Sequence, residues 1–193
     1  VHAYRWQNGT FTDLGSLGVG GTQTSAAAIN NSGQVVGQSR TTEGFDHAFL
    51  WQNGTMIDLG TLAEGGSSIA FGINDHGQVV GQTSTANGGH AFLWQNGTMT
   101  DLGTLPGGDG SSALDINNNG QVVGWSGTAS GSVHAFLWQN GTMIDLGTLG
   151  GTSSTAQGLN NLGQVVGVST AGLDRVGNPV NHAFLWQNGT MTD

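Results

Sequence analysis

The sequence contains no cysteine and no lysine among its 193 residues. Without cysteine, disulfide bonds and thiolate metal sites are excluded. Only Arg5, Arg40 and Arg175 are basic, whereas twelve residues are acidic, so the formal net charge is −9. Nucleic acids and anionic membrane surfaces are recognised by clustered Lys and Arg. We therefore expect no nucleic-acid partner.

Charged residues of either sign are scarce, at 8% of the chain against about 25% in an average domain. No apolar run approaches the ~20 residues of a membrane-spanning helix, and no segment has the composition of a signal peptide. We expect no membrane insertion. A neutral exterior rich in Ser, Thr, Asn, Gln and Gly suits glycan binding, self-assembly or an inert surface.

The abundant features are glycine, at 36 of 193 residues, and one repeated phrase. The phrase reads His-Ala-Phe-Leu-Trp-Gln-Asn-Gly-Thr-Met, and its first copy is the variant His-Ala-Tyr-Arg-Trp-Gln-Asn-Gly-Thr-Phe. The five copies begin at His2, His47, His90, His134 and His182. These starts lie 45, 43, 44 and 48 residues apart. A period in this range indicates a repeat array.

One repeat, residues 67–105, predicts four strands and two tight turns. Residues 67–73 alternate small and apolar side chains, and a polar turn ending in glycine leads to the β-branched segment 78–82. A variable stretch precedes a third strand at 90–94. The Asn-Gly pair that follows is the strongest short hairpin signal, and it leads to a fourth strand at 99–103. Each repeat is therefore predicted to be an antiparallel meander.

Both faces of this meander are apolar. In residues 90–94, His, Phe and Trp point to one side, and Ala and Leu point to the other. A lone meander cannot bury both faces, so neighbouring repeats must stack. The fold prediction is all-β, a β-propeller of four-stranded blades. A β-solenoid or a fibre of stacked meanders is the alternative.

The copies divide into about four and a half blades within a single array over residues 1–193. Residues 1–17 supply only a third and a fourth strand, and the complete repeats cover about 23–62, 67–105, 111–149 and 153–193. Because both ends fall inside a repeat, we expect either part of a longer chain or a molecule that completes itself by assembly. An open half blade has an unpaired strand edge, which is a template for pairing. The expected partners are a homo-oligomer or filament, or the rest of a longer chain.

The repeated His-Ala-Phe, combined with Gly-Gln-Val-Val-Gly, resembles the HAF repeat family, a probable extracellular repeat. The resemblance covers essentially the whole chain. It implies an extracellular or cell-surface location and carries no molecular activity. The unit is also distantly similar to the kelch blade, which implies only the propeller architecture.

Each repeat carries one His and one Asp at fixed places, and these could serve as metal ligands or as a structural network. A buried imidazole or carboxylate needs a hydrogen-bond partner, and catalysis seldom needs five identical dyads. We therefore predict a structural network and no metal or catalytic site. Its members are His2, His47, His90, His134, His182, Asp13, Asp58, Asp101, Asp145 and Asp193.

Departures from the repeat are the candidates for ligand binding, because loops on a rigid scaffold commonly carry function. Trp125 stands where other copies have Gln or Val, and the longest linker carries Asp174 and Arg175. Residues 115–120 match the start of a calcium loop, although Ser126 stands where its acidic twelfth residue should be. A polar hairpin turn explains this segment better.

The functional prediction is a non-enzymatic extracellular structural or protein-interaction module that self-assembles through its open half blade. The alternative is a glycan-binding, lectin-like propeller in which a repeated Trp stacks on sugar, although these Trp residues also suit the core between blades. A propeller-scaffold hydrolase or lyase is a third hypothesis, and it needs an asymmetric cluster of carboxylates or His. We predict no cofactor.

Overall fold

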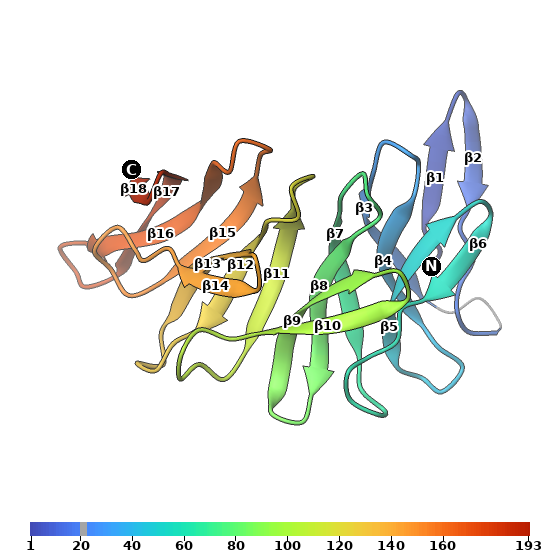
Figure 1. Ribbon diagram of the computed structural model, residues 1–193, viewed down its shortest axis with the longest axis horizontal. Coiled ribbons are helices and arrows are strands. Elements are labelled where there is room, and N and C mark those ends of the chain that lie inside the picture. The colour runs from blue at the N-terminus through green and yellow to red at the C-terminus, as the bar shows by residue number, and fades with distance from the viewer. Residues whose placement is uncertain (20–22) are drawn as a thin grey trace.

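A computed structural model describes residues 1–19 and 23–193 as four four-stranded antiparallel sheets and one two-stranded sheet. The sheets stand side by side in an arc, with the N- and C-termini at opposite ends (Figure 1). We call the four-stranded sheets blades 1 to 4 in chain order and the two-stranded sheet the half blade. No helix capable of crossing a membrane occurs within the described ranges.

The strands follow chain order within every sheet. The half blade consists of β1 (Tyr4–Gln7) and β2 (Thr10–Asp13). Blade 1 consists of β3 (Thr24–Ile29), β4 (Val35–Arg40), β5 (Asp46–Gln52) and β6 (Thr55–Asp58). Blade 2 consists of β7 (Ser68–Ile73), β8 (Val79–Thr85), β9 (Gly88–Gln95) and β10 (Thr98–Gly103). Blade 3 consists of β11 (Ser111–Ile116), β12 (Val122–Gly127), β13 (Val133–Gln139) and β14 (Thr142–Asp145). Blade 4 consists of β15 (Ser154–Leu159), β16 (Val165–Leu173), β17 (Pro179–Gln187) and β18 (Thr190–Thr192).

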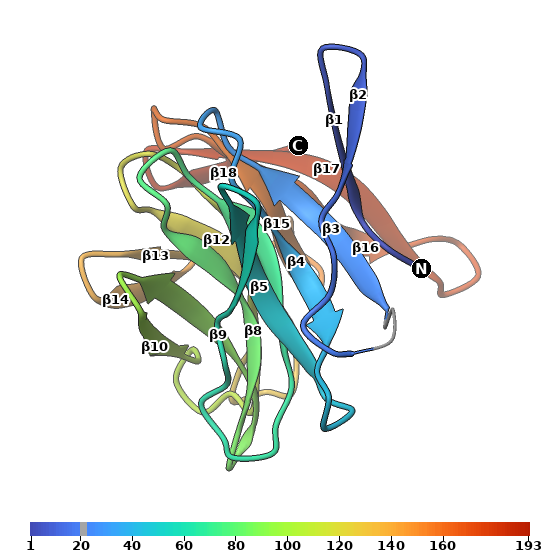
Figure 2. The same cartoon turned by 90° about the vertical axis from the view of Figure 1, so that its right-hand side faces the viewer.

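The first strand of each blade lies at the inner edge of the arc. Strands β3, β7, β11 and β15 contact one another in that order, whereas the fourth strand of each blade pairs only with its own third strand. The half blade projects from one end of the array (Figure 2). This radial arrangement confirms the β-propeller prediction with its four and a half blades, and it differs from the solenoid alternative.

The Asn-Gly pairs form the tight turns that the sequence predicts. Asn53 and Gly54 have φ angles of 51° and 81°, and the other four copies repeat these values within a few degrees. A type I′ turn needs positive φ at both central residues, and Asn and Gly tolerate it best. These turns therefore set the register of the third and fourth strands in every blade.

Glycine in the Val-Val-Gly strand is required for a different reason, which is close approach of the neighbouring strand. At Gly81, a Cβ atom would overlap the carbonyl oxygen of Ile69 on the neighbouring strand. Gly37, Gly124 and Gly167 face the same obstacle in their own blades. Each of these glycines lets the first strand approach the second at the point where the first strand bulges.

The apolar core lies between blades, in one cluster at each junction. Between blades 1 and 2, Val36 and Leu50 pack with Val79 and Phe92, and none of these four side chains is more than 2% exposed. Equivalent clusters join blade 2 to 3, blade 3 to 4 and the half blade to blade 1. The burial of apolar side chains therefore requires neighbouring blades, as the two-sided apolar pattern predicts.

A buried hydroxyl bridges each pair of adjacent complete blades. Ser68, at the start of blade 2, accepts a hydrogen bond from the backbone N–H of Ala48 in β5 (2.9 Å). It donates one to the carbonyl oxygen of Gly60 (2.6 Å), which follows β6. Ser111 and Ser154 make the same two bonds at the next junctions. These hydroxyls satisfy backbone groups that the strand ladders leave unpaired.

Amide side chains form a second connection, at the turns between first and second strands. The Asn74 side-chain N–H donates to the Asn117 carbonyl oxygen of the next blade (3.0 Å) and to Gln78 Oε1 in its own blade (2.6 Å). Gln78 Nε2 then donates to Gln95 Oε1 (3.2 Å). Blades 1 and 3 repeat both connections. A chain of amides thus runs outward across each blade and around the inner edge.

Replacing the bridging hydroxyl tests how strongly it joins the blades. In Ser68→Ala, the Ala48 N–H and the Gly60 carbonyl lose their partner inside a buried junction, which we expect to cost about 2–4 kcal/mol of unfolding free energy. Ser67→Ala alters the exposed neighbouring residue and is the control. Chemical denaturation measures both. Equal stability of the two variants would contradict the bridging role.

Candidate functional site

The structure joins every repeated His to the Asp eleven residues later. Nδ1 of His2, His47, His90, His134 and His182 lies 2.6–2.9 Å from the nearer carboxylate oxygen of its partner. The partners are Asp13, Asp58, Asp101, Asp145 and Asp193. A carboxylate only accepts, so Nδ1 carries the proton in each pair. The four Asp residues before Asp193 also accept the N–H of the glycine two residues later.

These pairs remain separate from one another. Each joins the third and fourth strands of one blade, or residues directly beside them, away from the inner edge where blades converge. In the described part of the chain, no three His, Asp or Glu side chains are grouped as metal ligands. The hydrogen bond from His2, together with that from the Gly15 N–H, lowers the pKa of Asp13 from its ordinary value. Each pair therefore acts as a clamp that joins the two strands of one hairpin.

The loop and strand candidates lie in two different blades. Trp125 lies in β12, half-buried, opposite Ser112 and Ala135. Asp174 and Arg175 lie in the turn between β16 and β17, where Asp174 accepts the N–H groups of Val176 (2.8 Å) and Asn178 (2.9 Å). These bonds lower the pKa of Asp174. Asp174 thus stabilises its own turn.

In the segment that matches a calcium loop, side-chain oxygens accept hydrogen bonds from backbone N–H groups of the protein. Asn117 Oδ1 accepts the N–H groups of Asn119 (3.0 Å) and Gln121 (3.0 Å) and so closes the turn between β11 and β12. Asp115 accepts the N–H of Ile116 (2.8 Å) and, across the junction, that of Leu159 (3.0 Å). Burial nevertheless raises the pKa of the Asp115 carboxyl. Asp115 is therefore a junction residue that the other blades replace with Ala or Gly.

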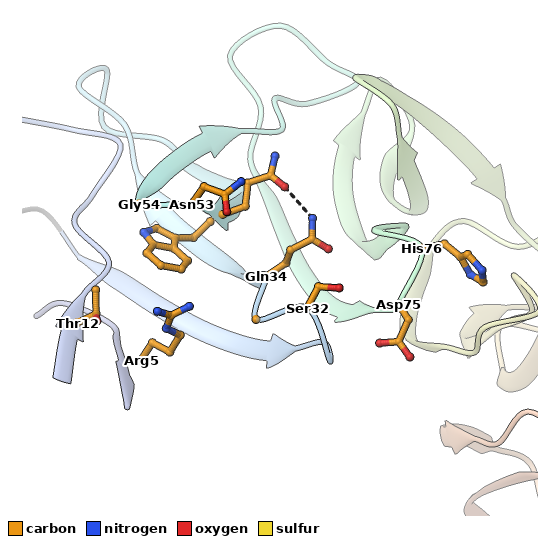
Figure 3. Close-up of a pocket in the computed structure, with 11 residues that line it drawn as sticks. Arg5, Thr12, Ser32, Gln34, Asn53, Gly54, Asp75 and His76 are labelled. Atoms are coloured by element: carbon orange, nitrogen blue, oxygen red, sulfur yellow. Dashed lines mark hydrogen bonds between the residues drawn. The ribbon is translucent and has the colours of Figure 1, made fainter. Parts of the chain in front are cut away.

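A hollow of about 650 Å³ lies where the half blade meets blade 1 (Figure 3). Arg5 and Thr12 line one side, and Asp75 and His76 of the next blade line the other. Gln34, hydrogen-bonded to Gln52 (2.7 Å), lies between them. Side-chain bonds from Asn118 and Asn31, and a backbone bond from Asn31, lower the pKa of Asp75.

Arg5 distinguishes this hollow from its counterpart between blades 2 and 3, where Leu93 occupies the same repeat position. The Arg5 guanidinium lies 4.8 Å from the centroid of the Trp51 ring, a cation–π distance. Its buried Nε has no hydrogen-bond partner among the residues described. The repeat pattern did not lead us to predict a site at Arg5, although Arg5 is the one departure from Leu at that place in the phrase.

Two exposed apolar faces lie at the ends of the array. The leading face, on the half blade, consists of Tyr4, Trp6 and Phe11. Trp6 is 62% exposed, whereas Trp51 in the same repeat position is 4% exposed. The sequence does not distinguish Trp6 from Trp51, because both occupy the same place in the repeated phrase, so this face was not predicted.

The trailing face, on blade 4, consists of Val166, Ala183 and Leu185. Val166 is 50% exposed and Leu185 is 39% exposed. Their counterparts Val36 and Leu50 are 0% and 2% exposed. The trailing face is therefore the surface that the earlier blades bury against the next blade.

The raised pKa of Asp115 predicts a pH dependence of stability. The folded protein holds the pKa of this carboxyl above its ordinary value of 3.8. The contribution of Asp115 to the free energy of unfolding is therefore greatest at low pH, and it falls as pH rises through the folded pKa. The free energy of unfolding of the unmodified protein, minus that of Asp115→Asn, should therefore be smaller at about pH 7 than at about pH 3. Denaturation at both pH values measures this difference. Glu64→Gln, at an exposed loop position, controls for charge, and a flat or reversed difference contradicts the prediction.

No protein family matches the chain, and no curated protein matches it. The resemblance to the HAF repeat family therefore stays a prediction. Among solved structures, Pyrococcus horikoshii acylaminoacyl peptidase is similar, with a TM-score of 0.53 and 16% sequence identity. The similarity covers 87% of this chain and 26% of the peptidase, so this chain spans about a quarter of that protein. At this identity the likeness shows the fold alone, an all-β array of propeller blades.

Proposed function

We propose that this chain is a non-enzymatic extracellular structural or protein-interaction module that associates through the ends of its blade array. The observation that carries the proposal is the exposure of the leading and trailing faces. The same repeat positions are buried or partly buried wherever a blade has a neighbour. Exposed contiguous apolar surface of this kind marks protein-association sites.

The repeated polar residues support a structural role. The five His–Asp pairs clamp hairpins, and the Asn and Gln side chains connect strands within and between blades. A hydrolase or lyase would need an asymmetric cluster of carboxylates or His, whereas these pairs form five similar and separate units. The HAF resemblance, with its extracellular implication, supports the location.

Self-association tests this proposal directly. We expect the weight-average mass of the protein, measured by light scattering, to rise with concentration. The double variant Trp6→Glu/Leu185→Glu places a carboxylate on each end face and should stay monomeric over the same range, because burying an unpaired charge is costly. A monomeric unmodified protein, or a double variant that associates equally well, would refute the proposal.

Glycan binding is the second candidate function, and the Arg5 hollow is the observation that favours it. The hollow combines one guanidinium, side-chain amides and the hydroxyls of Ser32 and Thr12. Guanidinium groups pair well with carboxylates, and amides and hydroxyls can bind sugar hydroxyls. Its ligand would therefore be an acidic sugar. Trp51 is too buried to stack on a sugar, so it positions Arg5 instead.

Arg5→Leu tests this second candidate while restoring the residue that the other copies carry. We expect a uronic-acid oligosaccharide, titrated by calorimetry, to bind the unmodified protein and to lose at least tenfold in affinity with Arg5→Leu, as loss of a charged hydrogen bond predicts. Arg175→Leu, which removes an exposed loop arginine, should bind unchanged. No binding by the unmodified protein, or equal losses in both variants, would exclude the site.

A further inference from the structure

We propose that the trailing face of one molecule binds the leading face of a second copy, so that the blade array continues from chain to chain. This inference rests on the proposed function, because it names the partner and the orientation of the same association. A second copy is the partner because the two faces are complementary halves of one junction. The chain builds that junction three times between its own complete blades.

The internal junctions show which side chains meet. Between blades 1 and 2, Val36, Ala48 and Leu50 pack in one cluster with Phe92, and Trp94 borders it. On the trailing face, the residues at the positions of Val36, Ala48 and Leu50 are Val166, Ala183 and Leu185. On the leading face, the residues at the positions of Phe92, Trp94 and Met99 are Tyr4, Trp6 and Phe11. The trailing face thus carries one side of the internal junction, and the leading face carries part of the other side.

One molecule cannot join its own two faces in this conformation. The half blade and blade 4 stand at opposite ends of the arc, and Figure 1 shows the termini apart. The junction must therefore form between molecules. Because the two surfaces differ, the contact is heterologous, and every molecule keeps one free face of each kind. Such contacts extend into filaments unless the rotation closes a ring.

The intermolecular junction is smaller than an internal one. The half blade contains only third-strand and fourth-strand equivalents, so no hydroxyl stands in the place of Ser68 to accept the N–H of Ala183. The first-strand contribution, made by Ala70 in the junction of blades 1 and 2, is also missing. We therefore expect reversible, concentration-dependent association instead of a permanent complex.

Mixing two single variants tests the orientation. Trp6→Glu disables the leading face and keeps the trailing face, whereas Leu185→Glu does the opposite. Sedimentation velocity should show each variant alone as a monomer. Their equimolar mixture should double in mass and stop there, because only one functional junction remains per pair. Both substituted side chains are exposed, and cooperative unfolding of each variant verifies that it folds.

Val176→Glu is the matched control, because Val176 is 81% exposed but lies in the β16–β17 turn, outside both faces. It should associate like the unmodified protein. If the unmodified protein associates but the mixture of Trp6→Glu and Leu185→Glu stays monomeric, the head-to-tail inference is overturned while the proposed function stands. Leu185→Glu alone forming dimers would indicate a symmetric contact and would also overturn it. A monomeric unmodified protein would overturn both proposals.

Discussion

Every blade in this protein is apolar on both faces, so each blade needs a neighbour on each side. Val35 and Val36 show the constraint at single-residue scale. Successive residues of a strand point to opposite faces, and Val35 packs towards the half blade while Val36 packs towards blade 2. In blade 4, the equivalent Val165 is buried but Val166 is half exposed. The apolar side chains on a given face are therefore buried only where another blade stacks against that face.

The same constraint favours neutral polar groups at the blade junctions. Polar groups at the blade junctions lie close to apolar clusters, where an unpaired charge would be costly. Neutral amides and hydroxyls can donate and accept at once, so they can be linked in series. The bonds from Asn74 to Gln78 and on to Gln95 form such a series, and Ser68 serves the backbone in the same way. The His–Asp pairs, which carry the chain's recurring carboxylates, lie on the more exposed outer hairpins.

The sequence predicts local structure well because the decisive signals are local. Asn53-Gly54 predicts its turn, and the spacing of 78–82 and 90–94 predicts the strand order within a blade. The contacts of Ser68 could not be predicted in this way, because they depend on how adjacent blades are tilted and spaced. The Arg5 hollow was also missed, since its walls come from the half blade and two blades that are distant in sequence. Long-range placement, and not residue identity, limited the prediction.

The five copies of the repeated phrase show how position in the array can change the role of one side chain. Trp6 and Trp51 occupy the same place in the phrase and in the hairpin, yet one is exposed and the other is buried beneath Arg5. Leu50 and Leu185 differ in the same way. Because the local sequences are nearly identical, these differences arise from the presence or absence of a neighbouring blade. The apolar surface at each end of the array thus consists of residues that form the core elsewhere in the repeat.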